Sequence, residues 1–282
     1  MVASRGGALV ASLAPPGTAE QAFDLALLSD LGTNRDNNED ACGSHAENES
    51  CVVFAVADGV GGYEGGEIAS AQAIEVTLSA FCQSPAGWGP AKRLHRAVQQ
   101  ANIEIHNRAM TVPELRRMAT TLTAAVVNDG VLYAAHVGDC RIYHIRRGKV
   151  RQITKDHTVV QERVRMGLIS AAKARHHPER SALSRCLGHE LIVAIDRITL
   201  PLQHNDQLLV CTDGLHSVLE DDELGKITRG LDAATGCRHL IDAANQRGTA
   251  DNLTVAIFTS KTDGPPSRST WRERLAVWLG RG

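Results

Sequence analysis

The sequence predicts an α+β fold in which antiparallel sheets are covered by helices. Short apolar runs with strand character recur along the chain, and several are bounded by Gly, Asp or Asn. Helical patterns come in pairs rather than after every strand, and this grouping favours antiparallel sheets over a doubly wound parallel sheet. With 282 residues, 43% of them hydrophobic and 22% charged, the chain is long enough to bury a sizeable core.

Eight segments have the length and composition of strands. They are the runs 23–28, 51–57, 120–127, 131–137, 140–146, 192–199, 207–212 and 253–259. The tripeptide Asn128-Asp129-Gly130 separates two of these runs. It predicts a hairpin turn, because both residues of an Asp-Gly pair tolerate positive φ angles.

Helical periodicity is strongest in two of the four segments that predict helices. Leu94, Val98, Ala101 and Ile105 follow the spacing i, i+4, i+7, i+11 and place one apolar stripe on a single helix face. The four predicted helices cover 64–82, 91–109, 221–228 and 233–246.

The chain divides into a leader, one folded domain and a tail. Residues 1–21 are rich in Ala, Gly and Pro without periodicity, so we expect a flexible leader. The domain spans 22–260 and contains a His- and Arg-rich segment at about 156–190, which predicts short helical pieces with loops. Residues 261–282 begin as a linker and end in a short amphipathic stretch. That stretch is either a peripheral membrane or partner helix, or a frayed helix.

Charge and cysteine content exclude several classes of protein. Thirty basic and 32 acidic residues give a net charge of −2, so the chain has no basic footprint for nucleic acid. No apolar window is long enough to predict a transmembrane segment, and the N-terminus makes a poor signal peptide. Seven cysteines without a C-x-x-C pair predict a reduced, cytoplasmic chain and argue against a disulfide framework or a thiolate zinc site.

Acidic side chains stand where several predicted strands begin or end. Asp58 and Asp213 each follow an apolar run and precede a glycine, and no partner strand follows that would explain a hairpin turn. Carboxylates gathered at one sheet edge would repel one another, whereas a pair of Mg²⁺ or Mn²⁺ ions would suit them and would activate water against a phosphoryl group. The other members of this set are Glu39, Asp40, Asp139 and Asp251.

Arg35 lies in the polar run that leads to these acids. Its planar guanidinium makes it the candidate for holding a phosphate. A solvated loop charge is the alternative interpretation of this residue.

The order of the motifs along the chain resembles that of the metal-dependent PPM, or PP2C-type, serine/threonine protein phosphatases, in particular their bacterial branch. The resemblance covers about residues 23 to 259. It implies a four-layer α-β-β-α sandwich, with two central antiparallel sheets flanked by helix pairs and a dinuclear metal site between the sheets. The motifs are SDLGTNRDNNED (29–40), VADGVGGYEGGEIAS (56–70), TTLTAAVV (120–127), HVGDCRIY (136–143), ITKDHT (153–158), HPERSALSRCLG (177–188), CTDGL (211–215) and ADNLTV (250–255).

The resemblance also implies roles for individual residues. Asp58 would bridge two Mn²⁺ or Mg²⁺ ions, and the Gly59 carbonyl would join one of them. Asp213 and Asp251 would complete the ligand set of that first ion.

Other residues would act around this pair of ions. Glu39 and Asp40 would contribute from the other side, partly through water. Arg35 matches the phosphate-binding arginine of the family. Asp139 and Ser181 would hold a third, weaker ion, and the segment 156–190 corresponds to the flap that shapes substrate access.

Two motifs depart from the family pattern. The usual DGMGG is DGVGG here, which places Val60 where eukaryotic members often have a histidine as candidate general acid. The source of the leaving-group proton therefore stays open between a metal-bound water and a second group near the site. The usual VGDSR is VGDCR, and Cys140 fits a buried strand residue better than a redox nucleophile.

The implied function is hydrolysis of phosphoserine and phosphothreonine in proteins by direct attack of metal-activated water. We expect a cytoplasmic enzyme that opposes a bacterial Hanks-type kinase and acts as a monomer. One alternative is a dedicated regulatory phosphatase of a single partner, such as a secretion-system scaffold or an anti-sigma antagonist. A second alternative is a module that binds phosphoproteins without catalysis.

Overall fold

The computed structural model describes residues 22–60, 65–85, 87–175 and 177–265. The predicted leader at 1–21 and the predicted amphipathic stretch at the end of the chain lie outside these ranges. The described residues form two five-stranded antiparallel sheets. One sheet has the order β1 (Phe23–Asp30), β10 (Leu253–Ser260), β9 (Gln207–Cys211), β6 (Arg141–Arg146) and β7 (Lys149–Gln152). The other has the order β2 (Asp40–Ala46), β3 (Cys51–Asp58), β4 (Leu122–Asn128), β5 (Val131–Val137) and β8 (Asp196–Pro201).

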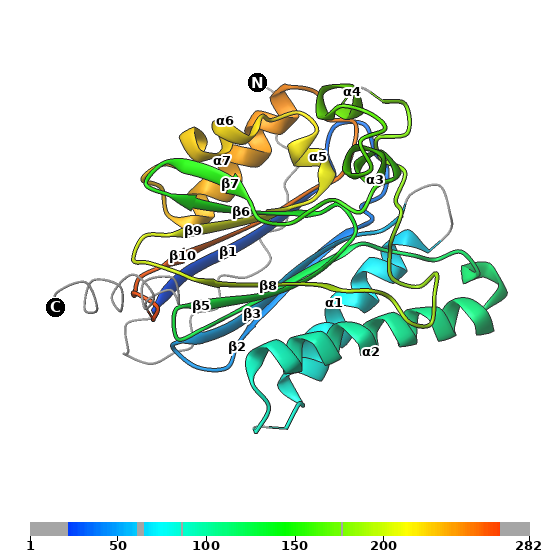
Figure 1. Cartoon of the computed structure of the whole chain (residues 1–282), viewed down its shortest axis with the longest axis horizontal. Helices are drawn as coiled ribbons and strands as arrows, with labels where there is room; N and C mark the ends of the chain where they lie inside the picture. Colours follow the sequence, from blue (N-terminus) through cyan, green and yellow to red (C-terminus); the bar gives the residue numbers. More distant parts are fainter. Residues whose placement is uncertain (1–21, 61–64, 86, 176, 266–282) are drawn as a thin grey trace, which may run out of the picture.

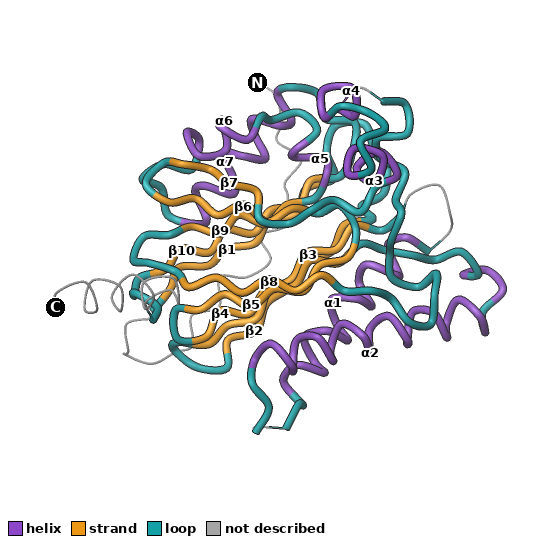
Figure 2. The backbone as a smooth tube through the Cα atoms, in the orientation of Figure 1, coloured by secondary structure: helices purple, strands orange, loops and turns teal. Residues whose placement is uncertain are grey.

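Helices cover the outer faces of both sheets, so the molecule has four layers (Figure 1). Figure 2 shows the strands stacked in the middle with helices on either side. This arrangement confirms the predicted α-β-β-α sandwich. The helices are α1 (Gly66–Cys82) and α2 (Pro90–Thr111) on one sheet, α5 (Asp213–His216), α6 (Asp221–Ile227) and α7 (Ala233–Gln246) on the other, and α3 (Val159–Arg165) and α4 (Ala171–Arg175) near one end.

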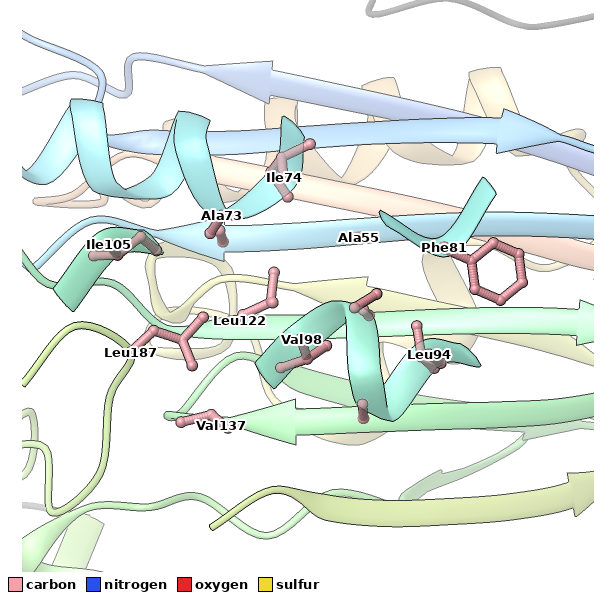
Figure 3. Close-up of a cluster of buried hydrophobic side chains, with 14 of the residues drawn as sticks. Ala55, Ala73, Ile74, Phe81, Leu94, Val98, Ile105, Leu122, Val137 and Leu187 are labelled. Atoms are coloured by element: carbon pink, nitrogen blue, oxygen red, sulfur yellow. The ribbon is translucent and has the colours of Figure 1, made fainter. Parts of the chain in front are cut away.

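Strand β3 is apolar along nearly its whole length because both of its faces are buried. Val53 and Ala55 pack with the residues of α1 and α2, and Figure 3 shows part of that cluster. Val52 and Phe54 point the other way, between the sheets, where Phe54 stacks on Phe258 with ring centroids 6.0 Å apart. The alternation follows from the two-residue period of a strand and fixes the register of its last residue, Asp58, at the sheet edge.

Two strands were not predicted, and a third begins later than predicted. The β2 sequence DACGSHA lacks β-branched residues, and β7 follows a short turn at Arg147-Gly148, where both φ angles are positive. The run expected at 192–199 becomes strand only from Asp196. The residues before Asp196 instead lie along α2, where the side chain of Gln99 donates to the Val193 carbonyl at 2.9 Å. Among the described helices, none is both long and apolar enough to cross a bilayer.

Candidate active site

Four of the predicted acids come together at one end of the two sheets. Asp58 is the last residue of β3, and Asp213 is the first residue of α5, directly after β9. Asp251 lies two residues before β10, which pairs antiparallel with β9, so both acids stand at the same edge. Asp139 lies in the turn between β5 and β6. These side chains line one cavity of about 620 Å³, together with Arg35, Gly59 and Ser181.

Glu39 and Asp40 lie beside this cavity without lining it. Asp40 is directly opposite Asp58 in the β2–β3 ladder. Its carboxylate accepts a 2.9 Å hydrogen bond from the hydroxyl of Thr212, which directly follows β9 of the other sheet. Glu39 reaches the start of α1, where a Cβ placed on Gly66 would lie 3.1 Å from Glu39 Oε1. Asp40 therefore connects the start of β2 to the end of β9, and Glu39 lies against the start of α1.

Close backbone packing explains the glycine that follows Asp58. The Gly59 amide donates to the Glu39 carbonyl at 3.0 Å. A Cβ on Gly59 would lie 2.3 Å from the carbonyl oxygen of Gly66, closer than real atoms approach. Gly214 is equally confined, because a Cβ there would lie 1.9 Å from the Asn252 carbonyl oxygen. Both Asp-Gly pairs therefore serve to pack the site and are not hairpin turns.

The carboxylates oppose one another's ionisation. Removal from water, followed by the charges of Asp40, Asp213, Asp139 and Asp251, raises the pKa of Asp58 well above its usual range. Burial, followed by the charges of Asp213 and Asp251, raises the pKa of Asp40 to about 7, although hydrogen bonds with Thr254 and Thr212 favour its charged form. Burial and the Asp251 charge raise the pKa of Asp213 to about 6. The charge of Arg35 favours the ionised form of Asp213, but the pKa of Asp213 stays raised.

The donor set fits hydrated divalent cations. Carboxylate and carbonyl oxygens suit Mg²⁺ or Mn²⁺, and a cation removes the repulsion that raises these pKa values. In the described ranges no group of three or more Asp, Glu, His or Cys side chains is placed so that it could hold a metal ion by itself. Waters and carbonyl oxygens would have to supply the remaining ligands, and Mg²⁺ usually keeps several waters and binds one or two carboxylates directly.

Arg35 reaches into the same cavity. Its Nη2 lies 2.9 Å from Oδ2 of Asp251, and its side chain stays 40% exposed. The guanidinium is therefore held at the acidic cluster and keeps donors open to solvent. This placement favours the phosphate-binding interpretation over that of a solvated loop charge.

The turn that carries Asp139 is held by two histidines that the sequence analysis did not single out. Gly138, with φ of 109°, donates its amide to His157 Nδ1 at 3.0 Å, and the His157 amide donates to the Gly138 carbonyl at 2.8 Å. His216 Nε2 donates to the Asp139 carbonyl at 3.1 Å. Cys140 is fully buried with Sγ 3.0 Å from the hydroxyl of Thr121, as expected of a packed strand residue.

The sequence analysis also missed Asn252, which connects two segments beside the site. Its Oδ1 accepts from the Glu39 amide at 2.9 Å, and its Nδ2 donates to the carbonyls of Leu31 and Asn37 at 3.0 Å. It thereby ties the polar run before Glu39 to the start of β10. Its position directly after Asp251 is the only sequence signal that points to it.

Comparison with known proteins gives one consistent match. The family model for protein phosphatase 2C matches residues 33–253. The serine/threonine phosphatase stp of Listeria monocytogenes is 33% identical over 238 residues, which cover 81% of this chain and 92% of that protein. The crystal structure of the serine/threonine phosphatase PstP/Ppp of Mycobacterium tuberculosis superposes with a TM-score of 0.77 at 34% identity, over 85% of this chain and 99% of that one. The catalytic domain of PstP in complex with two manganese ions gives a TM-score of 0.74 at 33% identity, over 84% and 97% of the two chains.

Proposed function

This chain belongs to the protein phosphatase 2C family, and we propose that it hydrolyses phosphoserine and phosphothreonine in proteins at the acidic cavity. The family is metal-dependent, and the relatives at 33% and 34% identity are serine/threonine phosphatases. These relatives therefore support an enzyme. They give no support to the alternative of a module that binds phosphoproteins without catalysis.

One observation carries the assignment of the site. Carboxylates from segments far apart in the sequence, namely Asp58, Asp139, Asp213 and Asp251, line a single cavity that also contains Arg35. A stable fold gains nothing from packing acids that raise one another's pKa. The cluster is better explained as a site that is completed by cations.

Different residues of the cavity would bind the cations and the phosphate. Asp58, the Gly59 carbonyl, Asp213 and Asp251 would hold one ion of a pair of Mn²⁺ or Mg²⁺ ions, and Glu39 and Asp40 would act on the other side. When bound, such ions supply an acidified water as nucleophile and offset the charge of the phosphoryl group. Asp139 and Ser181 both line the cavity and would hold a third, weaker ion.

Arg35 would hold and orient the phosphoryl group. A guanidinium can donate two parallel hydrogen bonds to phosphate oxygens, which fixes direction as well as charge. Positioning and charge neutralisation provide most of the catalysis in phosphoryl transfer. Val60 follows Gly59 and has no titratable group, so the leaving-group proton must come from water or from another residue of the cavity.

The test is hydrolysis of a phosphothreonine peptide by the metal-stripped chain, with and without added Mn²⁺. We expect turnover only with the metal, and loss of turnover in Asp58→Asn. Asp129→Asn is the matched control, because Asp129 lies in the exposed hairpin turn after β4. Turnover that survives both metal removal and Asp58→Asn would overturn the proposed site.

We extend the proposal to the cellular role. The substrates would be proteins phosphorylated by a cognate Hanks-type kinase, and the enzyme would act as a cytoplasmic monomer. A dedicated regulatory phosphatase of one partner is the alternative. Comparing the phosphoproteins of a deletion strain and its parent separates the two, because a dedicated enzyme changes one phosphoprotein and a general one changes many.

A further inference from the structure

Two large apolar side chains are exposed where the chain passes from the flap, the segment 156–190, to β8. Leu191 is 50% exposed and Ile192 is 75% exposed. Exposed side chains of this size leave apolar surface in contact with water. Covering that surface with a partner would be favourable in free energy.

The backbone that carries them is firmly held. Asn102 of α2, itself completely buried, donates from Nδ2 to the carbonyls of Glu190 and Leu191 at 2.9 and 3.0 Å. Its Oδ1 accepts from the Gly188 amide at 3.0 Å. Gln99, one turn earlier on α2, holds the carbonyl of Val193. The hydrogen bonds from Gln99 and Asn102 therefore hold the backbone of Leu191 and Ile192 beside α2, so little conformational entropy is lost when a partner covers them.

The same loop forms a wall of the acidic cavity. The residues on either side of the apolar pair, Glu190 and Val193, both line the cavity, as do His189 and Ala194. Leu191 and Ile192 do not themselves line the cavity, and both are exposed to solvent. The exposed pair is thus continuous with the cavity that contains Arg35.

We infer that Leu191 and Ile192 form a docking subsite for an apolar side chain of the phosphoprotein substrate, at a residue near the phosphorylated one. The inference rests on the proposed function. A polypeptide whose phosphate lies beside Arg35 has to leave the cavity on both sides of the phosphorylated residue. On one side of the cavity the rim is this loop, so a flanking side chain meets the two exposed apolar residues there.

The substrate is the occupant that the structure favours. The residues directly before and after this pair line the cavity, whereas no direct neighbour of Met166 or Leu168 does, although these two are exposed to a similar degree at 66% and 68%. Apolar exposure alone would not distinguish the two pairs. The neighbouring residues that line the cavity distinguish them. Met166 and Leu168 therefore serve as a matched control, because they are also apolar and exposed.

The test compares two double variants on two kinds of substrate. Leu191→Ser with Ile192→Ser removes the apolar rim, and Met166→Ser with Leu168→Ser is the control. The substrates are p-nitrophenyl phosphate, which has no flanking residues, and phosphothreonine peptides in which leucine or serine is placed at each flanking position in turn.

We expect the wild type to prefer leucine over serine at one flanking position. In the Leu191/Ile192 variant, kcat/KM for that leucine peptide should fall by about tenfold, the size typical of one lost apolar contact in a pocket. Turnover of p-nitrophenyl phosphate should not change, which also shows that the variant is folded. The control variant should behave as the wild type on every substrate.

Four results would overturn the inference. The first two are a wild type that turns over the peptides without preference for an apolar flank, and a Leu191/Ile192 variant that keeps the preference; in both cases the proposed function would stand alone. The third is a wild type that hydrolyses no phosphopeptide, which would remove the proposed function as well. The fourth is sedimentation that shows a dimer for the wild type and a monomer for the Leu191/Ile192 variant, since the occupant would then be a second copy of the chain.

Discussion

The guanidinium of Arg35 and the carboxylate of Asp251 are joined by a 2.9 Å ion pair, although the two residues are 216 positions apart in the sequence. One member of this pair is the candidate for binding phosphate and the other for binding metal. A cation at Asp251 would compete with Arg35 for the carboxylate and leave the guanidinium available to a phosphate. The two binding events are therefore expected to support each other.

Arg35→Ala should chiefly raise KM for a phosphopeptide at saturating Mn²⁺. Loss of a charge-assisted hydrogen bond costs about 1.5–3 kcal/mol, which corresponds to roughly 10- to 100-fold in KM. Arg35→Lys keeps the charge without the planar fork and should recover part of the loss. Steady-state kinetics measure the effect, with Arg238→Ala as control because Arg238 is exposed on α7 and does not line the cavity. An unchanged KM in Arg35→Ala would exclude a role in phosphate binding.

Asp58→Asn should lower activity and stabilise the metal-free protein at the same time. Turnover should fall by about 100-fold or more, because a group that sets the charge of the reacting centre is lost. The folded state raises the pKa of Asp58 above its unfolded value, so stability from this group is present at low pH and is lost as pH rises. At pH 8 the carboxyl group of Asp58 therefore destabilises the metal-free fold, and an amide, which does not titrate, does not.

Thermal unfolding of the metal-stripped protein at pH 8 measures the second effect. We expect Tm of Asp58→Asn to exceed that of the wild type by about 2–4 °C, the shift that accompanies about 1 kcal/mol in a domain of this size. Asp129→Asn should change neither activity nor Tm. A metal-free Asp58→Asn that is less stable than the wild type at pH 8 would mean that the acids are not crowded in the folded state.

His136 should make the protein sensitive to mild acid. Burial, followed by the nearby charge of His157, lowers the pKa of His136 to about 4, against about 6.5 in an unfolded chain. The unfolded state therefore takes up a proton first, and stability falls as pH drops from about 6.5 to 4, by up to about 3 kcal/mol. Denaturant unfolding across this pH range should show a shallower fall for His136→Gln than for the wild type.

His45 provides the control for this pH dependence, because it is exposed on β2. His45→Gln should keep the wild-type slope of stability against pH. If His136→Gln also keeps that slope, then His136 takes up its proton in the folded state and the burial argument fails.

Sequence alone predicted that several of the acids stand at strand ends, because they flank strongly apolar runs. VVFAVA before Asp58 and LTVAIF after Asp251 have the length and residue types of strands buried on both faces, and the acids stand where burial ends. Strand β2 could not be predicted in this way. Its sequence has weak strand preference, and it is a strand because it pairs with β3, with Asp40 opposite Asp58.

Contacts between distant segments set the rest of the site. The pairing of Arg35 with Asp251 and the support of Gly138 by His157 depend on how the two sheets and the flap meet. No local pattern encodes such contacts. The late start of β8 has the same origin, because the side chains of Gln99 and Asn102 bind the backbone that precedes it.

The central claim is that these carboxylates form one cradle for a pair of divalent cations, and equilibrium dialysis of the metal-stripped chain against Mn²⁺ tests it most directly. The account predicts a pair of tightly bound ions per chain in the wild type and in Asp129→Asn, and loss of tight binding in Asp58→Asn. Tight binding that is absent in the wild type, or that persists unchanged in Asp58→Asn, would contradict it.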